Sequence, residues 1–331
     1  RHGNSPALPP VLIAGCGAIG GFLAAALTRA GADVQVLARG AGARALSAGP
    51  LRVRDGEHTY STRLNVARAP GGIRPPGLVV VAVESFDTAP LLDALPPPLT
   101  PGKPVLSFQN GVDNPETIRA RLPAGPVGGV AVYLGCQRPA PDLVVRRPSR
   151  DPRTGAPRDL LAGGGPGEIG HHLAAIGRLI GVPTRVGTDA RVALWTKLVA
   201  NASLNTVTAL GRARVGRVFA DEQAVELMRR LGDEVGAAAR PPGVDVPPDA
   251  PAHYVADARR RLPADGGSSM LFDLEAGRRL EREALVGAVV RHAERLDLAT
   301  PISRVRAALL ELADPWQGPT GDESVTAPSG G

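Results

Sequence analysis

The sequence predicts an α/β protein, with an N-terminal Rossmann-type dinucleotide-binding domain followed by an all-helical C-terminal domain. Three observations predict this fold. A glycine-rich turn follows the first apolar run, further apolar runs typical of strands recur as far as residue 186, and only helical periodicity follows residue 191. We therefore expect the two domains at 11–187 and 188–316, with disordered segments at 1–10 and 318–331.

Composition narrows the classes of partner. The net charge is +6, but no basic block is interleaved with aromatic residues, so a small polyanionic ligand such as a dinucleotide fits better than nucleic acid. Cys16 and Cys136 stand in no metal-ligand spacing, which indicates a reducing, cytoplasmic setting. The six histidines form no metal motif, and no apolar run is long enough to span a membrane.

The first element is a strand at 11–14, followed by a glycine turn and a helix at 22–30. The first glycine permits the tight turn, the second lets a pyrophosphate approach the backbone, and the third allows close packing of helix on strand. In this context the motif favours a dinucleotide site over a purely structural turn. The expected cofactor-binding residues here are Gly15, Gly17, Ala18, Ile19 and Gly20.

The second strand, at 33–38, ends at Arg39, where an NAD site usually carries a carboxylate for the ribose 2′-hydroxyl. A guanidinium at that point matches a 2′-phosphate instead, so we expect NADPH as the cofactor. The alternative is an exposed loop arginine, since all but two of the chain's 38 Lys and Arg residues are arginine.

Later strands are expected at 78–83, 105–108 and 127–134, and a hairpin at 143–146 and 160–161. Ligands of open α/β sheets bind beyond the carboxyl ends of the strands. Asn110 and Gly111 directly follow one such end, so Asn110 is expected to meet the reacting end of cofactor and substrate. The alternative is a plain Asn-Gly turn.

Helices are expected at 190–210, 218–239, 249–262, 268–296 and 302–313. The first carries Lys197, Asn201 and Asn205 at i, i+4 and i+8, which share one face of a helix. Lys103 is the only other lysine, and an ammonium, unlike a guanidinium, can give up a proton when it is buried. A surface lysine beside two incidental amides is the alternative.

These motifs, together with Ser268-Ser269-Met270-Leu271-x-Asp273 and Glu281, closely resemble the ketopantoate reductase family, in the same order over roughly residues 11–313. That family comprises the NADPH-dependent 2-dehydropantoate 2-reductases of pantothenate synthesis. The resemblance implies that a 2-keto acid is reduced to a 2-hydroxy acid, most simply ketopantoate to pantoate. Reduction of another ketone or imine, and a non-catalytic NADPH sensor, are the alternatives. The long helices of the second domain suggest a homodimer.

The resemblance also assigns roles to single residues. Lys197 matches the catalytic lysine and Glu281 the essential acid, while Asn110, Asn201, Asn205 and Ser269 are expected to bind the substrate, and Asn110 also the nicotinamide. Reduction of a ketone leaves an alkoxide, which needs the proton donor and the positive charge that a lysine supplies.

Two departures from the family pattern bear on the substrate. Glu84 stands where the family has a lysine, and Val215 stands where it has an asparagine. Geometry raises a further question. In one continuous helix, Ser269 and Glu281 would lie about 18 Å apart along the axis. Either the helix bends or begins later, with Gly277 as the candidate hinge, or Ser269 has a capping role.

Overall fold

The computed structural model describes residues 8–96, 102–122, 124–150, 154, 156–240, 243–244 and 246–316. Residues 1–7 and 318–331, which were expected to be disordered, lie outside the described residues. The same expectation covered residues 8–10, which instead contact the N-terminal domain. Leu8 packs against the core, and the carbonyl oxygen of Pro10 accepts hydrogen bonds from the backbone N–H groups of Gly77 and Leu78.

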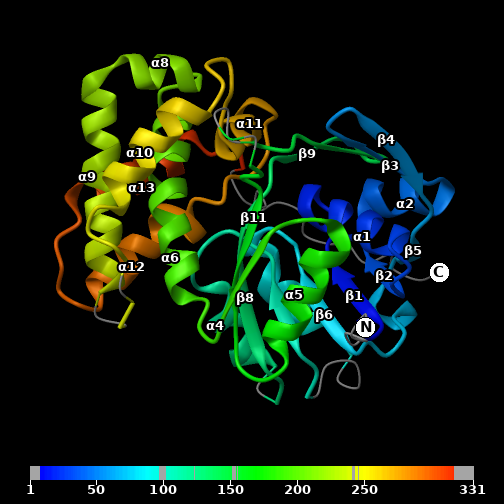
Figure 1. The fold of residues 1–331 in the computed structure, drawn as a ribbon. Helices are drawn as coiled ribbons and strands as arrows, with labels where there is room; N and C mark the ends of the chain where they lie inside the picture. Colours follow the sequence, from blue (N-terminus) through cyan, green and yellow to red (C-terminus); the bar gives the residue numbers. More distant parts are fainter. Residues whose placement is uncertain are drawn as a thin grey trace, which may run out of the picture.

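An eight-stranded sheet forms the centre of the N-terminal domain (Figure 1), in the order β12-β11-β8-β7-β6-β1-β2-β5. The strands are β1 (Val11–Ala14), β2 (Val34–Leu37), β5 (Asn65–Ala67), β6 (Leu78–Val81), β7 (Val105–Ser107), β8 (Val127–Tyr133), β11 (Leu160–Gly164) and β12 (Thr184–Gly187). Only the β8–β11 pair is antiparallel. The carboxyl ends of β7, β6, β1 and β2 therefore lie in a row along one edge.

Helices cover both faces of this sheet, as expected for strands that are apolar throughout. On one face, α1 (Ala18–Arg29) and α5 (Ile169–Ile180) bury Phe22 and Ile176. On the other face, α3 (Thr88–Ala94) and α4 (Asn114–Arg121) bury Leu92 and Ile118. A further helix, α2 (Gly40–Ala48), follows β2.

A second, four-stranded sheet has the order β4-β3-β10-β9 and packs on α1. It consists of β3 (Leu51–Asp55), β4 (His58–Thr62), β9 (Cys136–Ala140) and β10 (Leu143–Arg146). The expected hairpin between 143–146 and 160–161 is therefore wrong. β10 pairs with β3 and β9, whereas β11 joins the large sheet beside β8. The apolar side chains of β10 and of β11 are therefore buried in two different sheets.

From Arg191 to Ala313 the described chain contains helices and connecting loops without strands. The helices are α6 (Arg191–Ala200), α7 (Thr206–Leu210), α8 (Val215–Ala220), α9 (Glu222–Ala239), α10 (Ala250–Arg261), α11 (Ser269–Glu275), α12 (Ala288–Glu294) and α13 (Pro301–Ala313), with two π-helical segments, η4 (Asn201–Asn205) and η5 (Glu283–Gly287). The helix expected at 268–296 is broken after Glu275, and Gly277 has φ +65°. Ser269 and Glu281 therefore do not lie on one continuous helix.

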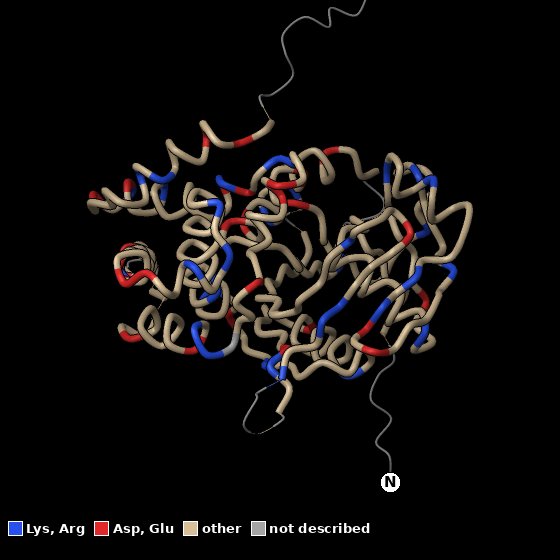
Figure 2. Tube along the Cα trace, turned by 90° about the horizontal axis from the view of Figure 1, so that it is seen from above, with Lys and Arg blue, Asp and Glu red and all other residues tan. Residues whose placement is uncertain are grey.

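Charged residues of both signs are interspersed over the two domains (Figure 2). Within the described ranges, no helix is both long and apolar enough to cross a bilayer.

Candidate active site

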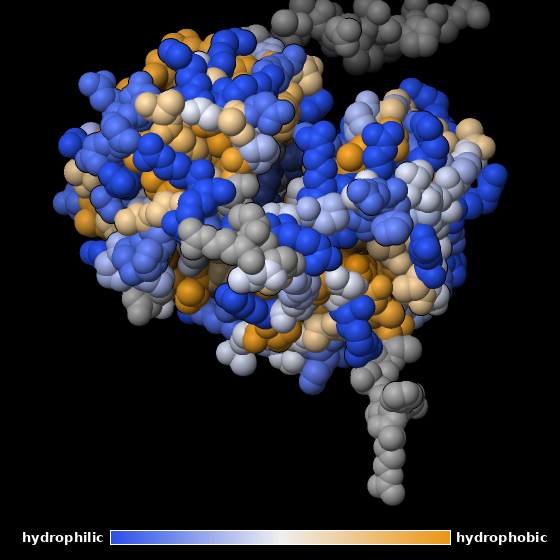
Figure 3. Space-filling view, turned by 45° about the horizontal axis from the view of Figure 1, so that its top comes forward, coloured by the Kyte–Doolittle hydropathy of each residue, from blue (hydrophilic) through white to orange (hydrophobic). Residues whose placement is uncertain are grey.

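The expected site residues gather where the sheet edge meets the helical domain. Asn110 follows β7, Ser85 follows β6, and Gly15 follows β1. On the other side, α6 packs against β8 and β11, where Leu194 contacts Ala131 and Ala162. In Figure 3 the surface is hollowed between the helical domain on the left and the N-terminal domain on the right, and hydrophilic side chains border the hollow.

The glycine turn has the geometry that a phosphate site requires. Gly15 has φ +105°, and a Cβ there would lie 2.8 Å from the carbonyl oxygen of Ala82. A Cβ on Gly20 would collide with the carbonyl oxygen of Gly15. A Cβ on Gly17, by contrast, would meet no atom within 4 Å, so the space beside this backbone is open. The N–H groups of Ala18 and Ile19 open α1 without a side-chain cap, so they remain available to an anion.

Arg39 lies just beyond β2 in this row, as the N-cap residue of α2. Its side chain is 76% exposed and forms an ion pair of 2.6 Å with Asp87, which follows β6. Since β1 lies between β2 and β6 in the sheet, the pair spans the end of the strand that carries the glycine turn. The guanidinium therefore lies next to the turn.

Asn110 connects the two residues that were expected to be catalytic. Its Oδ1 accepts a 2.9 Å hydrogen bond from Lys197 Nζ, and its Nδ2 donates a 2.9 Å hydrogen bond to Glu281 Oε2. Asn201 Nδ2 donates a longer bond of 3.4 Å to the same Oδ1. Lys197 and Glu281, which lie 87 and 171 positions from Asn110 in the sequence, thus both bond to its carboxamide.

The second oxygen of Glu281 is held by a residue that was not expected in the site. Ser85 donates to Glu281 Oε1 from both its backbone N–H and its Oγ, each at 2.9 Å. Glu281 is 9% exposed and accepts three hydrogen bonds from neutral donors. The sequence did carry one signal for Ser85. It lies just beyond a buried strand, where ligands of open α/β sheets bind.

The electrostatics of Lys197 suit proton transfer. Burial lowers the pKa of its amine to about 8, against the opposing effect of the negative charge of Glu281. The amine also lies 5.8 Å from the centre of the Tyr133 ring. A lysine with a pKa near neutrality can both carry a proton and release it at physiological pH.

Asn205 and Ser269 form a second pair in the helical domain. Asn205 Nδ2 donates to Ser269 Oγ at 3.5 Å, and Ser269 is exposed. The cap of α11 is Ser268 rather than Ser269, because Ser268 Oγ accepts from the N–H of Leu271. Ser269 is thus not the capping residue, and its hydroxyl remains exposed. Val215 belongs to an apolar cluster around Val218 and Phe219 instead.

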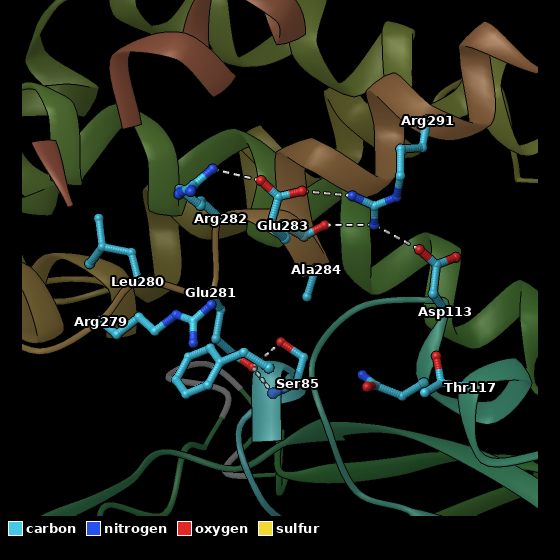
Figure 4. Close-up of a pocket in the computed structure, with 12 residues that line it drawn as sticks. Ser85, Asp113, Thr117, Arg279, Leu280, Glu281, Arg282, Glu283, Ala284 and Arg291 are labelled. Carbon is cyan, nitrogen blue, oxygen red and sulfur yellow. Dashed lines mark hydrogen bonds and ion pairs between the residues drawn. The ribbon is translucent and has the colours of Figure 1, made fainter. Parts of the chain in front are cut away.

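The loop that carries Asn110 is clamped between the domains. Asp113 accepts one hydrogen bond of 3.0 Å from Arg291 and pairs with His292 at 2.6 Å, both from α12. Figure 4 shows a pocket beside Ser85 and Glu281 in which Arg291 links Asp113 to Glu283. The two contacts of Asp113 tie the loop after Asn110 to α12, and they were not expected from the sequence.

Family models match both halves of the chain. The model described as Ketopantoate reductase PanE/ApbA matches residues 11–154, and Ketopantoate reductase PanE/ApbA C terminal matches residues 189–313. The chain belongs to the ketopantoate reductase family. Members of that family are NADPH-dependent oxidoreductases, so the chain is an oxidoreductase with a Rossmann-type domain.

Individual ketopantoate reductases support this. The 2-dehydropantoate 2-reductase of Mesorhizobium japonicum is 32% identical, over 92% of this chain and 97% of the relative. That of Halobacterium salinarum is 31% identical, over 77% and 82%. The ketopantoate reductase structure from Ralstonia eutropha JMP134 superimposes with a TM-score of 0.82 at 29% identity, over 92% of this chain and 98% of that one.

Proposed function

We propose that this ketopantoate reductase family member uses NADPH to reduce ketopantoate to pantoate, a step of pantothenate synthesis, in a cytoplasmic setting. The observation that carries the proposal is the hydrogen-bonded series Lys197–Asn110–Glu281 at the carboxyl ends of the strands. Residues 11–187 would bind the cofactor, and residues 188–316 would contribute the remaining substrate contacts.

The residues present fit the cofactor. The open backbone at Gly17 and the uncapped start of α1 offer N–H donors to a pyrophosphate, and the exposed Arg39 offers a fork of donors to a 2′-phosphate. When bound, NADPH supplies the hydride. Asn110 would hold the nicotinamide or the substrate at the adjoining strand end.

The remaining residues are arranged for a small 2-keto acid. Lys197 would polarise the ketone oxygen and give it a proton as negative charge develops there. Glu281 would keep the amine charged, since its negative charge raises the pKa of Lys197. Asn201 and Asn205 would orient the substrate, and the exposed hydroxyl of Ser269 would bind its carboxylate.

The function is tested by following NADPH oxidation with ketopantoate beside a panel of bulkier 2-keto acids and a cyclic imine. We expect the highest kcat/KM with ketopantoate. Turnover of another ketone or imine alone would support the alternative of a different substrate, and NADPH binding without any turnover would support the sensor.

Arg39→Ala is expected to weaken NADPH binding by about tenfold to a hundredfold and to leave NADH binding unchanged, since a charge-assisted contact to the 2′-phosphate is lost. The dissociation constants of both cofactors, measured by fluorescence titration, check this. Arg74→Ala serves as the control, because Arg74 pairs with Asp33 before β2, at the opposite end of that strand. An unchanged NADPH to NADH ratio in Arg39→Ala would contradict the assignment.

We also propose that two copies pair through α13. Its exposed side chains Val305, Leu309 and Leu312 recur at helical spacing, and Leu312 is 83% exposed. Leu312→Glu is expected to shift the protein from dimer to monomer in sedimentation velocity. A wild-type protein that is monomeric at micromolar concentration would contradict pairing through α13.

A further inference from the structure

Arg138 lies beside the expected cofactor site and has no role in the chemistry described so far. It belongs to β9, in the four-stranded sheet that lies over α1 and α2 (Figure 1). A Cβ on Gly42 would lie 3.2 Å from Nη2 and 3.5 Å from Nη1 of Arg138, so the guanidinium lies against the first turn of α2. Because the Cα–Cβ bonds of a helix tilt toward its N-terminus, a group at this position lies on the side of α2 nearer Arg39.

The glycine turn is the second feature near this guanidinium. Burial raises the pKa of the Cys16 thiol, and the positive charge of Arg138 opposes that rise. Cys16 stands between Gly15 and Gly17 in the turn, and Cys136, two residues before Arg138, packs against the same core as Cys16. The side chain of Arg138 is thus close both to the glycine turn and to the helix after β2, the two elements that bind the adenosine half of a dinucleotide.

The guanidinium of Arg138 has few partners within the protein. Its Nη2 donates to the carbonyl oxygen of Pro141, and its Nε is buried without a partner. Within the described ranges Arg138 takes part in no ion pair, and Asp142, the acidic residue next to Pro141, pairs with Arg52 instead at 2.8 Å. The described part of the protein therefore leaves the charge of Arg138 without a counterion.

The charge balance at Arg39 calls for a second cation. A ribose 2′-phosphate is a monoester that carries about 1.5 to 2 negative charges at neutral pH. Arg39 forms an ion pair of 2.6 Å with Asp87, so the two side chains together are close to neutral. A 2′-phosphate at this pair would meet a guanidinium whose charge is already offset. Arg138 supplies the positive charge that the pair lacks.

We propose that Arg138 is a cofactor-binding residue, whose guanidinium joins Arg39 in holding the 2′-phosphate of NADPH. This inference rests on the 2′-phosphate site proposed at Arg39. The two guanidinium groups come from distant parts of the chain, since Arg39 follows β2 of the large sheet and Arg138 lies on β9 of the small one. Contacts between guanidinium groups and phosphates are charge-assisted and add geometric specificity. A bound 2′-phosphate would thus link the small sheet to the large one.

The test uses two ligands that differ only in the 2′-phosphate, adenosine 2′,5′-bisphosphate and adenosine 5′-monophosphate. Their dissociation constants are measured by isothermal titration calorimetry for wild type, Arg138→Gln, Arg138→Lys and Arg39→Ala. The ratio of the two constants reports on the 2′-phosphate, because a general loss of folding or of adenosine binding affects both ligands. Arg52→Gln is the matched control, since Arg52 lies on β3 of the same sheet and pairs with Asp142 in the turn after β9.

We expect the preference for the bisphosphate to fall by about tenfold in Arg138→Gln, the loss typical of one hydrogen bond to a charged group. In Arg138→Lys, which keeps a point charge for the phosphate, it should fall by less than about threefold. Arg52→Gln should keep the wild-type preference. A wild-type preference in Arg138→Gln, or an equal fall in Arg138→Gln and Arg52→Gln, would overturn the inference.

Arg39→Ala separates this inference from the proposed cofactor site. If wild type has no preference for the bisphosphate, the site at Arg39 is wrong and the role of Arg138 is wrong with it. A preference that falls in Arg39→Ala but not in Arg138→Gln supports the site and refutes the role of Arg138. If Arg138→Gln fails to fold, Arg39→Ala decides. A remaining preference of about tenfold supports the second cation, and its complete loss overturns the inference.

Discussion

Lys197→Ala is expected to reduce kcat by about 10²–10⁴-fold, because a positioned general acid contributes about that much to the rate. NADPH binding should persist, since the amine lies on α6 and contacts Asn110, whereas the glycine turn lies at the start of α1. Single-turnover rates and NADPH titration measure the two effects separately.

Two controls make this result specific. Lys197→Arg keeps the positive charge but cannot release a proton, so it should not restore turnover. Lys103→Ala removes the only other lysine, which lies before β7, and should behave as wild type. Full activity in Lys197→Ala would refute the proposed mechanism.

The pH profile follows from the same amine. Proton donation needs the charged form, and burial lowers the pKa of Lys197 to about 8. The value of kcat/KM should therefore fall as pH rises through about 8. A rate that stayed flat up to pH 10 would mean that another group supplies the proton.

Glu281→Gln is expected to lower kcat/KM by about 10²–10³-fold, with both a lower kcat and a higher KM. The substitution removes the charge that supports the Lys197 ammonium. It also replaces one carboxylate oxygen, which accepts from Ser85 or Asn110, by an amide NH2 group, which only donates. Steady-state kinetics over a pH series should also show the alkaline limb at lower pH than in wild type.

Glu283→Gln provides the neighbouring control. This carboxylate pairs with Arg282 and Arg291 at the rim and lies two residues from Glu281. It should retain the pH limb of the wild type. A profile of Glu281→Gln that matched this control would show that Glu281 does not act on the amine.

Local patterns were enough to predict the parts of the molecule that depend on neighbouring residues. The glycine turn, the buried strands and the placement of Asn110 beyond a strand end all follow from short stretches. The pairing of β10 with β3 could not be predicted, because it joins segments about 90 residues apart and depends on packing over α1. The same holds for Ser85, whose partner Glu281 is 196 residues away.

The π-helical segment η4 is a further feature that the sequence did not predict. A regular α-helix would place Lys197, Asn201 and Asn205 on a face that drifts around the axis by about 40° every four residues. The wider turn of η4 advances less per residue and draws Asn205 back toward that face. Nothing in the spacing alone distinguishes the two kinds of turn.

The carboxamide of Asn110 also bears on how Lys197 would regain its proton. It separates the amine of Lys197 from the carboxylate of Glu281, and an amide passes polarisation between its neighbours but holds its own hydrogens firmly. Under the proposed mechanism, no proton would pass between Lys197 and Glu281 through this amide. Lys197 would then regain its proton from solvent after each turnover, so in Glu281→Gln the alkaline limb should move rather than vanish.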